Sequence, residues 1–99
     1  MKLLTKDIEK KLVKQLDTYE EDPVLQVKFF LDNWTWYAYE YNPQTRTFFG
    51  LVDGLELEMG SFSLDELESV TGQLGTKVER DLYFTPEPVS QVWNFHKDF

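Results

Sequence analysis

Apolar residues recur at helical spacing near the start of the chain, where they are interleaved with lysines. The apolar positions are Ile8, Leu12, Val13 and Leu16. Thr5 precedes them and is a suitable N-cap, because its hydroxyl can accept a hydrogen bond from the first helical turn. Pro23 cannot continue a helix and pushes Asp22 toward an extended conformation. We therefore predict a first helix that begins after Thr5 and ends near residues 17–20.

Four segments in the middle of the chain have the aromatic, β-branched or alternating composition that is typical of strands. They are residues 24–31, 34–41, 46–52 and 55–59. The first segment alternates, so Leu25 and Val27 are expected on the same face. Asp53-Gly54 predicts a type I′ hairpin turn, which needs a positive φ at both central residues. After this turn, Leu55 and every second residue that follows it are expected to point inward.

The remainder of the chain predicts two more helices and one more strand. Ser63 and Glu66 have the spacing of a capping box at the start of a short helix. Residues 78–84 are expected to add a fifth strand, and residues 88–96 a last helix. The whole chain, residues 1–99, is thus predicted to form a single α+β domain. Its centre would be a four- to five-stranded antiparallel meander with the helices packed mainly on one face.

The composition excludes several classes of protein. The 99 residues include no cysteine and one histidine, so disulfide scaffolds, zinc fingers and thiol enzymes are ruled out. There is no phosphate-binding glycine loop, dinucleotide fingerprint or serine-hydrolase elbow, and we expect no cofactor, no metal and no catalytic residues. No apolar run approaches the roughly 20 residues of a membrane span, and the first residues lack the apolar core of a secretion signal. We therefore expect a cytoplasmic protein that does not enter a membrane.

The charge is acidic and unevenly distributed along the chain. There are ten lysines and arginines and eighteen acids, which gives a net charge of −8. Residues 1–14 carry five lysines and two acids, whereas residues 15–99 have a net charge of −11. An acidic body repels phosphate, so the sequence predicts no direct binding of nucleic acid. The lysines are expected to form the solvated face of the first helix.

Six carboxylates fall in a stretch of sixteen residues that contains no lysine or arginine. They are Asp53, Glu56, Glu58, Asp65, Glu66 and Glu68. If the strand and the helix that carry them are neighbours, they could imitate the charge of a nucleic-acid duplex and bind a basic groove. The alternatives are that they are solvated outer faces, or that some of them bind a divalent metal or serve acid–base catalysis.

Aromatic residues supply a second candidate surface. Sixteen of the 99 residues are aromatic. Trp34 and Trp36 are expected on one face of their strand, and the tyrosines at positions 37, 39 and 41 on the other. Exposed tryptophan and tyrosine dominate protein interfaces, so the candidate anchors for a protein partner are Trp36, Tyr37 and Tyr39. Packing of these rings in the core is the alternative.

Arg80 lies between two acids, Glu79 and Asp81, in the predicted fifth strand. Alternation places Arg80 on the apolar side of that strand, where a guanidinium needs a partner. The candidate partners are an internal carboxylate, such as Glu40 or Asp53, and a partner protein that Arg80 would anchor. A small hydrolase that uses Glu79 and Asp81 with a metal ion is an alternative interpretation.

Four motifs together resemble a known family. In chain order they are DPVLQVKFF (22–30), NWTWYAYEY (33–41), FFGLVDGLELEMGSFSLDELESV (48–70) and LGTKVERDLYF (74–84). Over about residues 3–88 the chain resembles the small bacterial proteins grouped as domain of unknown function 2958, and residues 89–99 lie outside this pattern as a C-terminal extension. The resemblance implies a protein of plasmids, conjugative elements or phages, encoded near replication, transfer and anti-defence genes. It supplies no established catalytic residues.

These observations favour a non-enzymatic binding protein of a phage or mobile element, present as a monomer or homodimer. We expect it to inhibit or modulate a host nucleic-acid enzyme, such as a CRISPR or restriction nuclease, by occupying its basic groove. Two alternatives stay open. One is an accessory subunit of the element's own replication or transfer machinery, and the other is a small metal-dependent hydrolase.

Overall fold

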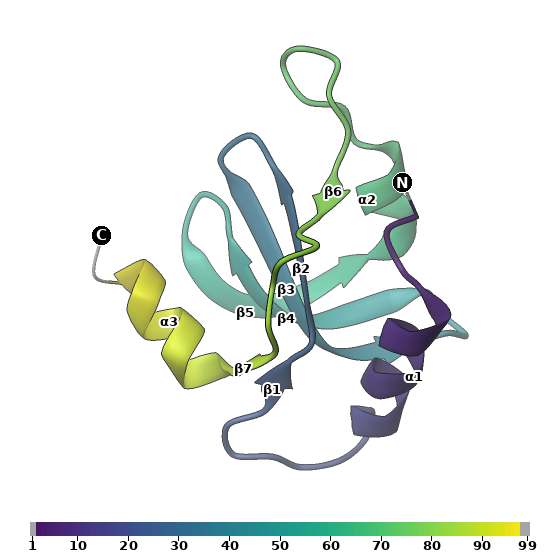
Figure 1. Ribbon diagram of the computed structural model, residues 1–99, viewed down its shortest axis with the longest axis vertical. Helices are drawn as coiled ribbons and strands as arrows, with labels where there is room; N and C mark the ends of the chain where they lie inside the picture. The colour runs from purple at the N-terminus through teal and green to yellow at the C-terminus, as the bar shows by residue number, and fades with distance from the viewer. Residues whose placement is uncertain (1, 98–99) are drawn as a thin grey trace.

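The computed structural model describes residues 2–97 and is built on a five-stranded antiparallel sheet (Figure 1). The strand order is β5-β4-β3-β2-β6. The strands are β2 (Val27–Leu31), β3 (Trp34–Asn42), β4 (Thr47–Asp53), β5 (Leu57–Ser63) and β6 (Glu79–Arg80). The first four are neighbours both along the chain and in the sheet, which confirms the predicted α+β class and its meander.

Helices cover both faces of this sheet (Figure 1). α1 (Lys6–Gln15) and α2 (Leu64–Ser69) pack on one face, named here the first face, and α3 (Val89–Lys97) packs on the second face. Two of these three helices therefore share a face, as predicted. The second face is also covered by a two-stranded ribbon of β1 (Val24–Leu25) and β7 (Glu87–Pro88).

The core under α1 and α2 is built around aromatic rings. Phe48 is fully buried, and its ring centroid lies 4.7 Å from that of Tyr41. The rings of Phe62 and Phe29 lie 5.2 Å and 5.4 Å from Phe48. Leu12 of α1 is fully buried in the same cluster. Since each such side chain contributes roughly 2–3 kcal/mol when it leaves water, this cluster holds the first-face helices on the sheet.

Polar side chains fix the ends of the helices. The hydroxyls of Thr5 and Ser63 each accept a hydrogen bond from the backbone N–H three residues later (3.2 and 2.9 Å), so both predicted N-caps are confirmed. α1 ends at Gln15, slightly earlier than predicted. The carboxylate of Asp22 accepts hydrogen bonds from the N–H and hydroxyl of Ser90, which ties the loop before β1 to the first turn of α3.

The predicted strand 24–31 is interrupted at Gln26. The backbone N–H of Gln26 donates to the carbonyl of Ala38 (2.8 Å), outside the ladder of β2. As a result Leu25 packs in the core of the second face and Val27 in the core of the first. The prediction that these two residues share a face is therefore wrong, because one residue without strand pairing between them reverses the alternation.

A β-bulge lies in β3, where the register with β4 shifts between Ala38 and Glu40. The extra residue reverses the alternation beyond it. Tyr41 therefore packs on the first face, although Tyr37 and Tyr39 pack on the second. The prediction of one shared face is confirmed for Tyr37 and Tyr39 and is wrong for Tyr41.

The β4–β5 turn differs from the predicted type I′ turn. β4 runs through Asp53, β5 starts at Leu57, and neither Asp53 nor Gly54 has a positive φ. A glycine is needed at position 54 for lack of space, because a Cβ there would lie 2.1 Å from the ring of Trp34. Leu55 lies in the turn and is 93% exposed, so its predicted inward position is wrong.

The predicted fifth strand, residues 78–84, is shortened to the two residues of β6. Glu79 and Arg80 pair with β2, opposite Phe30 and Phe29. Beyond them the chain leaves the ladder and passes in front of β2 toward β7 (Figure 1). This crossing segment adds Phe84 to the core of the second face, so its residues cover the sheet instead of extending it.

Gly50 of β4 and Gly60 of β5 are paired in the sheet and provide a matched test of this packing. A Cβ on Gly50 would lie 1.9 Å from the carbonyl oxygen of Tyr37 and 2.8 Å from the Cα of Ala38, whereas no atom lies within 4 Å of one on Gly60. We predict that Gly50→Ala lowers the free energy of unfolding by about 3 kcal/mol, because backbone atoms must move. Gly60→Ala should change it by less than about 1 kcal/mol. Urea unfolding measures both, and equal effects would contradict the packing.

Candidate partner-binding site

An apolar hollow of about 350 Å³ opens on the first face, where the β2–β3 turn meets the loop after α2. Its walls include Leu31, Asp32, Trp34, Trp36, Val70 and Gln73. Trp34 is 39% exposed and Val70 is 41% exposed, so apolar surface is open to solvent here. We name this feature the tryptophan hollow.

The walls of the tryptophan hollow are held in place by the sequence around them. Trp34 and Trp36 are two residues apart in β3, so they share a face, and their rings stack with centroids 5.9 Å apart. The loop after α2 forms the opposite wall. There the N–H of Gln73 donates to Asp32 Oδ2 (3.2 Å), and a Cβ on Gly72 would lie 2.8 Å from the same oxygen. The hollow is thus a built feature of the fold.

Two of the predicted carboxylates lie in the part of the sheet next to Trp34 and Trp36, outside the lining of the hollow. The register places Trp36 opposite Val52 and Val52 opposite Glu58, so Trp36 and Glu58 share a face about 10 Å apart. Glu58 is exposed, and Glu56 is exposed in the adjoining β4–β5 turn. We name Glu56, Glu58 and Asp32, which lines the hollow, the acidic rim.

The carboxylates of α2 form a separate group. Asp65, Glu66 and Glu68 follow the far end of β5, so about 20 Å of strand separates them from Glu58. Arg46 bridges two of them, with Nε 2.8 Å from Asp65 and Nη2 3.0 Å from Glu68. Asp65 above all raises the pKa of Arg46. The six predicted carboxylates therefore do not form one continuous row, and an arginine from outside their stretch neutralises part of this group.

Asp53 belongs to a chain of hydrogen bonds under α3. His96 Nδ1 lies 2.9 Å from Asp53 Oδ2, and His96 Nε2 lies 2.7 Å from the hydroxyl oxygen of Tyr37. In the tautomer that satisfies all three groups, Nδ1–H donates to the carboxylate and Nε2 accepts the phenolic proton. The chain of bonds joins α3 to β3 and β4, which gives the one histidine of the sequence a structural position.

The hydroxyl of Tyr37 is suited neither to nucleophilic chemistry nor to partner contact. Tyr37 is 3% exposed. Burial, followed by the negative charges of Asp53, Glu87 and Asp81, raises the pKa of Tyr37 to about 12. A nucleophile needs a lowered pKa, and an interface anchor needs an exposed side chain. The predicted role of Tyr37 as an anchor is therefore wrong.

Tyr39 and Arg80 are engaged within the fold. Tyr39 packs against the core of the second face, and burial raises its pKa. Arg80 Nη1 donates to the carbonyl oxygens of Lys2 and Leu3, the second at 3.0 Å. These two hydrogen bonds fix the N-terminal segment to β6, and the expected carboxylate partner of Arg80 stays a prediction. Among the four predicted anchors, Trp36 is the one that borders the tryptophan hollow.

Sequence reasoning missed part of this site. Alternation in β3 was the signal for Trp34, which shares its face with Trp36. No local pattern marks Val70 or Gln73, because Gln73 meets Asp32 across 41 positions of the chain. Within residues 2–97 no group of three or more histidine or acidic side chains could hold a metal ion. No helix of this part of the chain has the length and apolar character needed to cross a membrane.

The raised pKa of Tyr37 makes the free energy of unfolding depend on pH in the alkaline range. The folded state favours the neutral phenol, so this contribution is complete below pH 10.0 and is lost as the pH rises through about 12. We predict that the unfolding free energy of the wild type falls by about 2–3 kcal/mol over this pH range. The unfolding free energy of Tyr37→Phe should not show this fall, because the variant has no phenol at position 37. The substitution itself costs about 1 kcal/mol near neutral pH, because the bond to His96 is absent. Urea unfolding at several pH values measures the difference, with the exposed Tyr19→Phe as control, and parallel curves would contradict it.

A comparison with protein families matches residues 3–96 to the family described as protein of unknown function (DUF2958). The match includes α3 up to residue 96, although the sequence resemblance places residues 89–99 outside the family pattern. No curated protein and no solved structure matches the chain significantly. Since the family match covers nearly all of its length, the chain belongs to the DUF2958 family.

Proposed function

We propose that this chain is a non-enzymatic binding protein of a phage or mobile element, which inhibits or modulates a host nucleic-acid enzyme of the CRISPR or restriction type. It would act by occupying the nucleic-acid-binding surface of that enzyme. The observation that carries the proposal is the tryptophan hollow, an open apolar site with stacked indole rings and an acidic rim.

The tryptophan hollow suits the side chains that line a nucleic-acid-binding groove. Lysine and arginine combine an apolar stem with a cationic head. The stem can pack against Trp34 and Trp36, and a cation over an indole ring gains about 1–2 kcal/mol when it is desolvated. The head can then bind Glu58 or Asp32, since charge-assisted hydrogen bonds are the stronger kind. One basic side chain seated here would meet the requirements of an interface hot spot.

The charge of the chain supports the same class of partner. Residues 15–99 have a net charge of −11, and a basic groove attracts such a body before contact. The acids of α2 contribute to this attraction without lining the tryptophan hollow. We therefore expect fast, salt-sensitive association, with a dissociation rate that depends mainly on the hollow.

Affinity capture of the tagged chain from host lysate tests the proposal, with washes at low and at high salt. The expected result is one nucleic-acid enzyme that is retained at low salt and released at high salt. Capture of the element's own replication or transfer proteins would instead favour an accessory subunit of that machinery. The absence of any partner in both washes would contradict a binding function.

The side chain of Trp34 should carry much of the affinity for the captured enzyme. Trp34→Ala removes one of the two stacked rings, and we predict that it weakens binding about thirty-fold or more. Tyr19→Ala is the matched control, because Tyr19 is also a large aromatic and is 89% exposed, but it lies outside the hollow. Surface plasmon resonance measures both affinities, and unchanged binding by Trp34→Ala would exclude the hollow as the contact.

The acidic rim should affect the rate of dissociation as well as the rate of association. The double variant Glu56→Gln/Glu58→Gln and the control Glu20→Gln/Glu21→Gln remove the same charge, so both should slow association by a similar factor. Only the first pair includes a residue on the face of Trp36, two strands away, and we predict that only it speeds dissociation, by about ten-fold. Equal dissociation rates for the two double variants would show that the rim does not touch the partner.

A further inference from the structure

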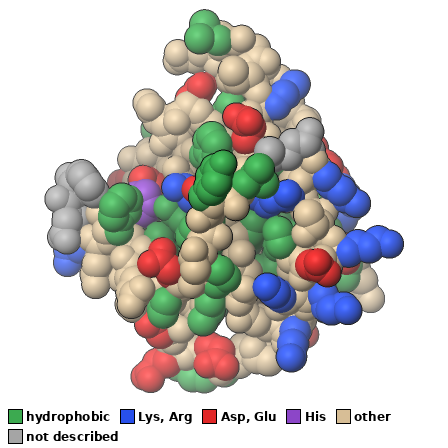
Figure 2. Space-filling model, viewed as in Figure 1, with side chains coloured by type: hydrophobic (Ala, Val, Ile, Leu, Met, Phe, Trp, Pro, Cys, Tyr) green, Lys and Arg blue, Asp and Glu red, His purple; other side chains and the backbone are tan. Residues whose placement is uncertain are grey.

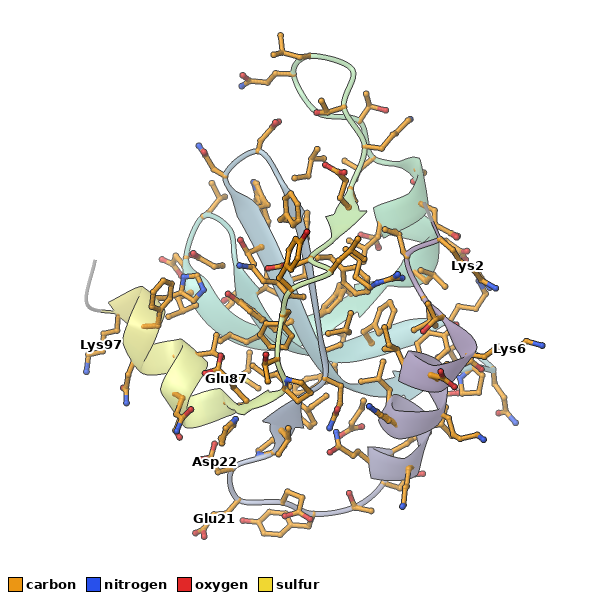
Figure 3. All side chains as sticks on the ribbon, viewed as in Figure 1. Lys2, Lys6, Glu21, Asp22, Glu87 and Lys97 are labelled. Atoms are coloured by element: carbon orange, nitrogen blue, oxygen red, sulfur yellow. The ribbon has the colours of Figure 1, made fainter. Side chains whose placement is uncertain are left out.

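A basic groove runs along the outer side of α1 and α2. Figure 2 shows lysine and arginine side chains gathered on the right of the molecule, over α1 and the N-terminal segment. Lys2 and Lys6 lie on this side in Figure 3, whereas Glu21, Asp22 and Glu87 lie at the lower left. The positive charge of a protein with a net charge of −8 is thus concentrated in one region.

The groove consists of two depressions of about 590 and 540 Å³. Lys2 and Glu68 line both, so the two depressions meet at these residues. The basic residues along the groove are Lys10, Lys6, Arg46, Lys2 and Lys77, and three glutamates also line it. Half of the ten basic residues of the chain therefore line these two adjoining depressions.

The lysines of the groove are held at defined positions. Arg80 binds the backbone carbonyls of Lys2 and Leu3, and the buried side chain of Leu3 anchors the same segment in the first-face core. Lys6 and Lys10 are four residues apart on α1, so they lie on the same side of the helix with an axial rise of about 6 Å. The groove therefore presents a row of lysines on fixed backbone positions.

The lysine heads in this row are available to a ligand. Arg46 is already engaged by Asp65 and Glu68. In contrast, within residues 2–97 no carboxylate lies at ion-pairing distance from Lys2, Lys6 or Lys10. A cluster of unpaired like charges raises the energy of the free protein, and an anionic ligand would relieve that repulsion.

We infer that the groove binds the phosphodiester backbone of a nucleic-acid strand. The available cations are all lysines, which act on phosphate as strongly hydrated point charges, and the one groove arginine suited to bidentate carboxylate binding is occupied. The lysines would contact phosphates and not base edges, so binding is independent of sequence. The inference does not rest on the proposed function, since it uses no residue of the tryptophan hollow.

The net charge of −8 does not prevent this contact. Charges on the surface are screened over about 8–10 Å at physiological salt, so acids on the opposite side act weakly at the groove. The sequence-based expectation of no nucleic-acid binding rests on the net charge of the whole chain. The fold places several lysines together at the groove, where the local charge differs from that average. Three phosphate contacts predict a modest affinity, with a dissociation constant of about 10⁻⁴–10⁻⁶ M at low salt.

Fluorescence anisotropy with a fluorescein-labelled oligothymidine, and with a labelled duplex of equal length, tests the inference. For the single strand we predict a slope of about −2 in a plot of log K against log salt concentration, which corresponds to three released counterions. Lys6→Gln/Lys10→Gln should weaken binding about ten-fold at about 50 mM salt and bring the slope to about −0.7. Binding of the duplex in place of the single strand would support the same phosphate contact with a steeper slope.

Lys11→Gln/Lys97→Gln is the matched control, since it removes the same charge from two exposed lysines that neither line the groove nor continue the row of Lys6 and Lys10. It should change the affinity by less than about two-fold. Equal losses in the two double variants would overturn the inference, because they would indicate diffuse attraction to positive charge anywhere on the surface. Absence of binding at about 50 mM salt, or binding of a poly-glutamate peptide as tight as that of the oligonucleotide, would also overturn it.

Discussion

The β-bulge in β3 is the constraint on which the rest of the structure depends. β3 pairs with β2 on one side and with β4 on the other, so its alternation decides which face receives each aromatic ring. Because the extra residue between Ala38 and Glu40 reverses that alternation, Trp36 and Tyr41 both serve the first face, and Tyr37 serves the second. Each face then carries apolar surface that must be covered, which is why a chain of 99 residues places helices on both sides of one sheet.

The surface left uncovered by this arrangement supplies both candidate contacts. α1 and α2 cover the part of the first face that holds Tyr41 and Phe48, so the stacked rings of Trp34 and Trp36 border open solvent at the other end. The lysines of α1 point away from the same core, since an amphipathic helix that buries one side exposes the other. An acidic protein can thus present one apolar site with an acidic rim and, separately, one row of cations.

Much of the fold follows from local sequence patterns, and most of the site does not. Ser63 caps α2 as predicted, since capping and alternation involve residues close in the chain. The bulge has no such signal, and it moved Tyr41 to the other face. The site depends on contacts between distant residues, such as Gln73 with Asp32 and Arg80 with the carbonyl of Leu3. The sequence alone identified Trp36, Glu56 and Glu58 as candidates. The buried position of Tyr37 was needed to separate it from Trp36. The strand register and the ion pairs of Arg46 were needed to separate Glu58 from the acids of α2.

The central claim is that the protein and a nucleic acid compete for one surface of the partner enzyme. The most direct measurement titrates this protein into a complex of the captured enzyme with its labelled nucleic acid and follows the bound label. Use of the Lys6→Gln/Lys10→Gln variant weakens any contact of the basic groove with the label. The account predicts full displacement of the label, at protein concentrations that rise with the concentration of nucleic acid. A stable ternary complex that retains the label at saturating protein would contradict it.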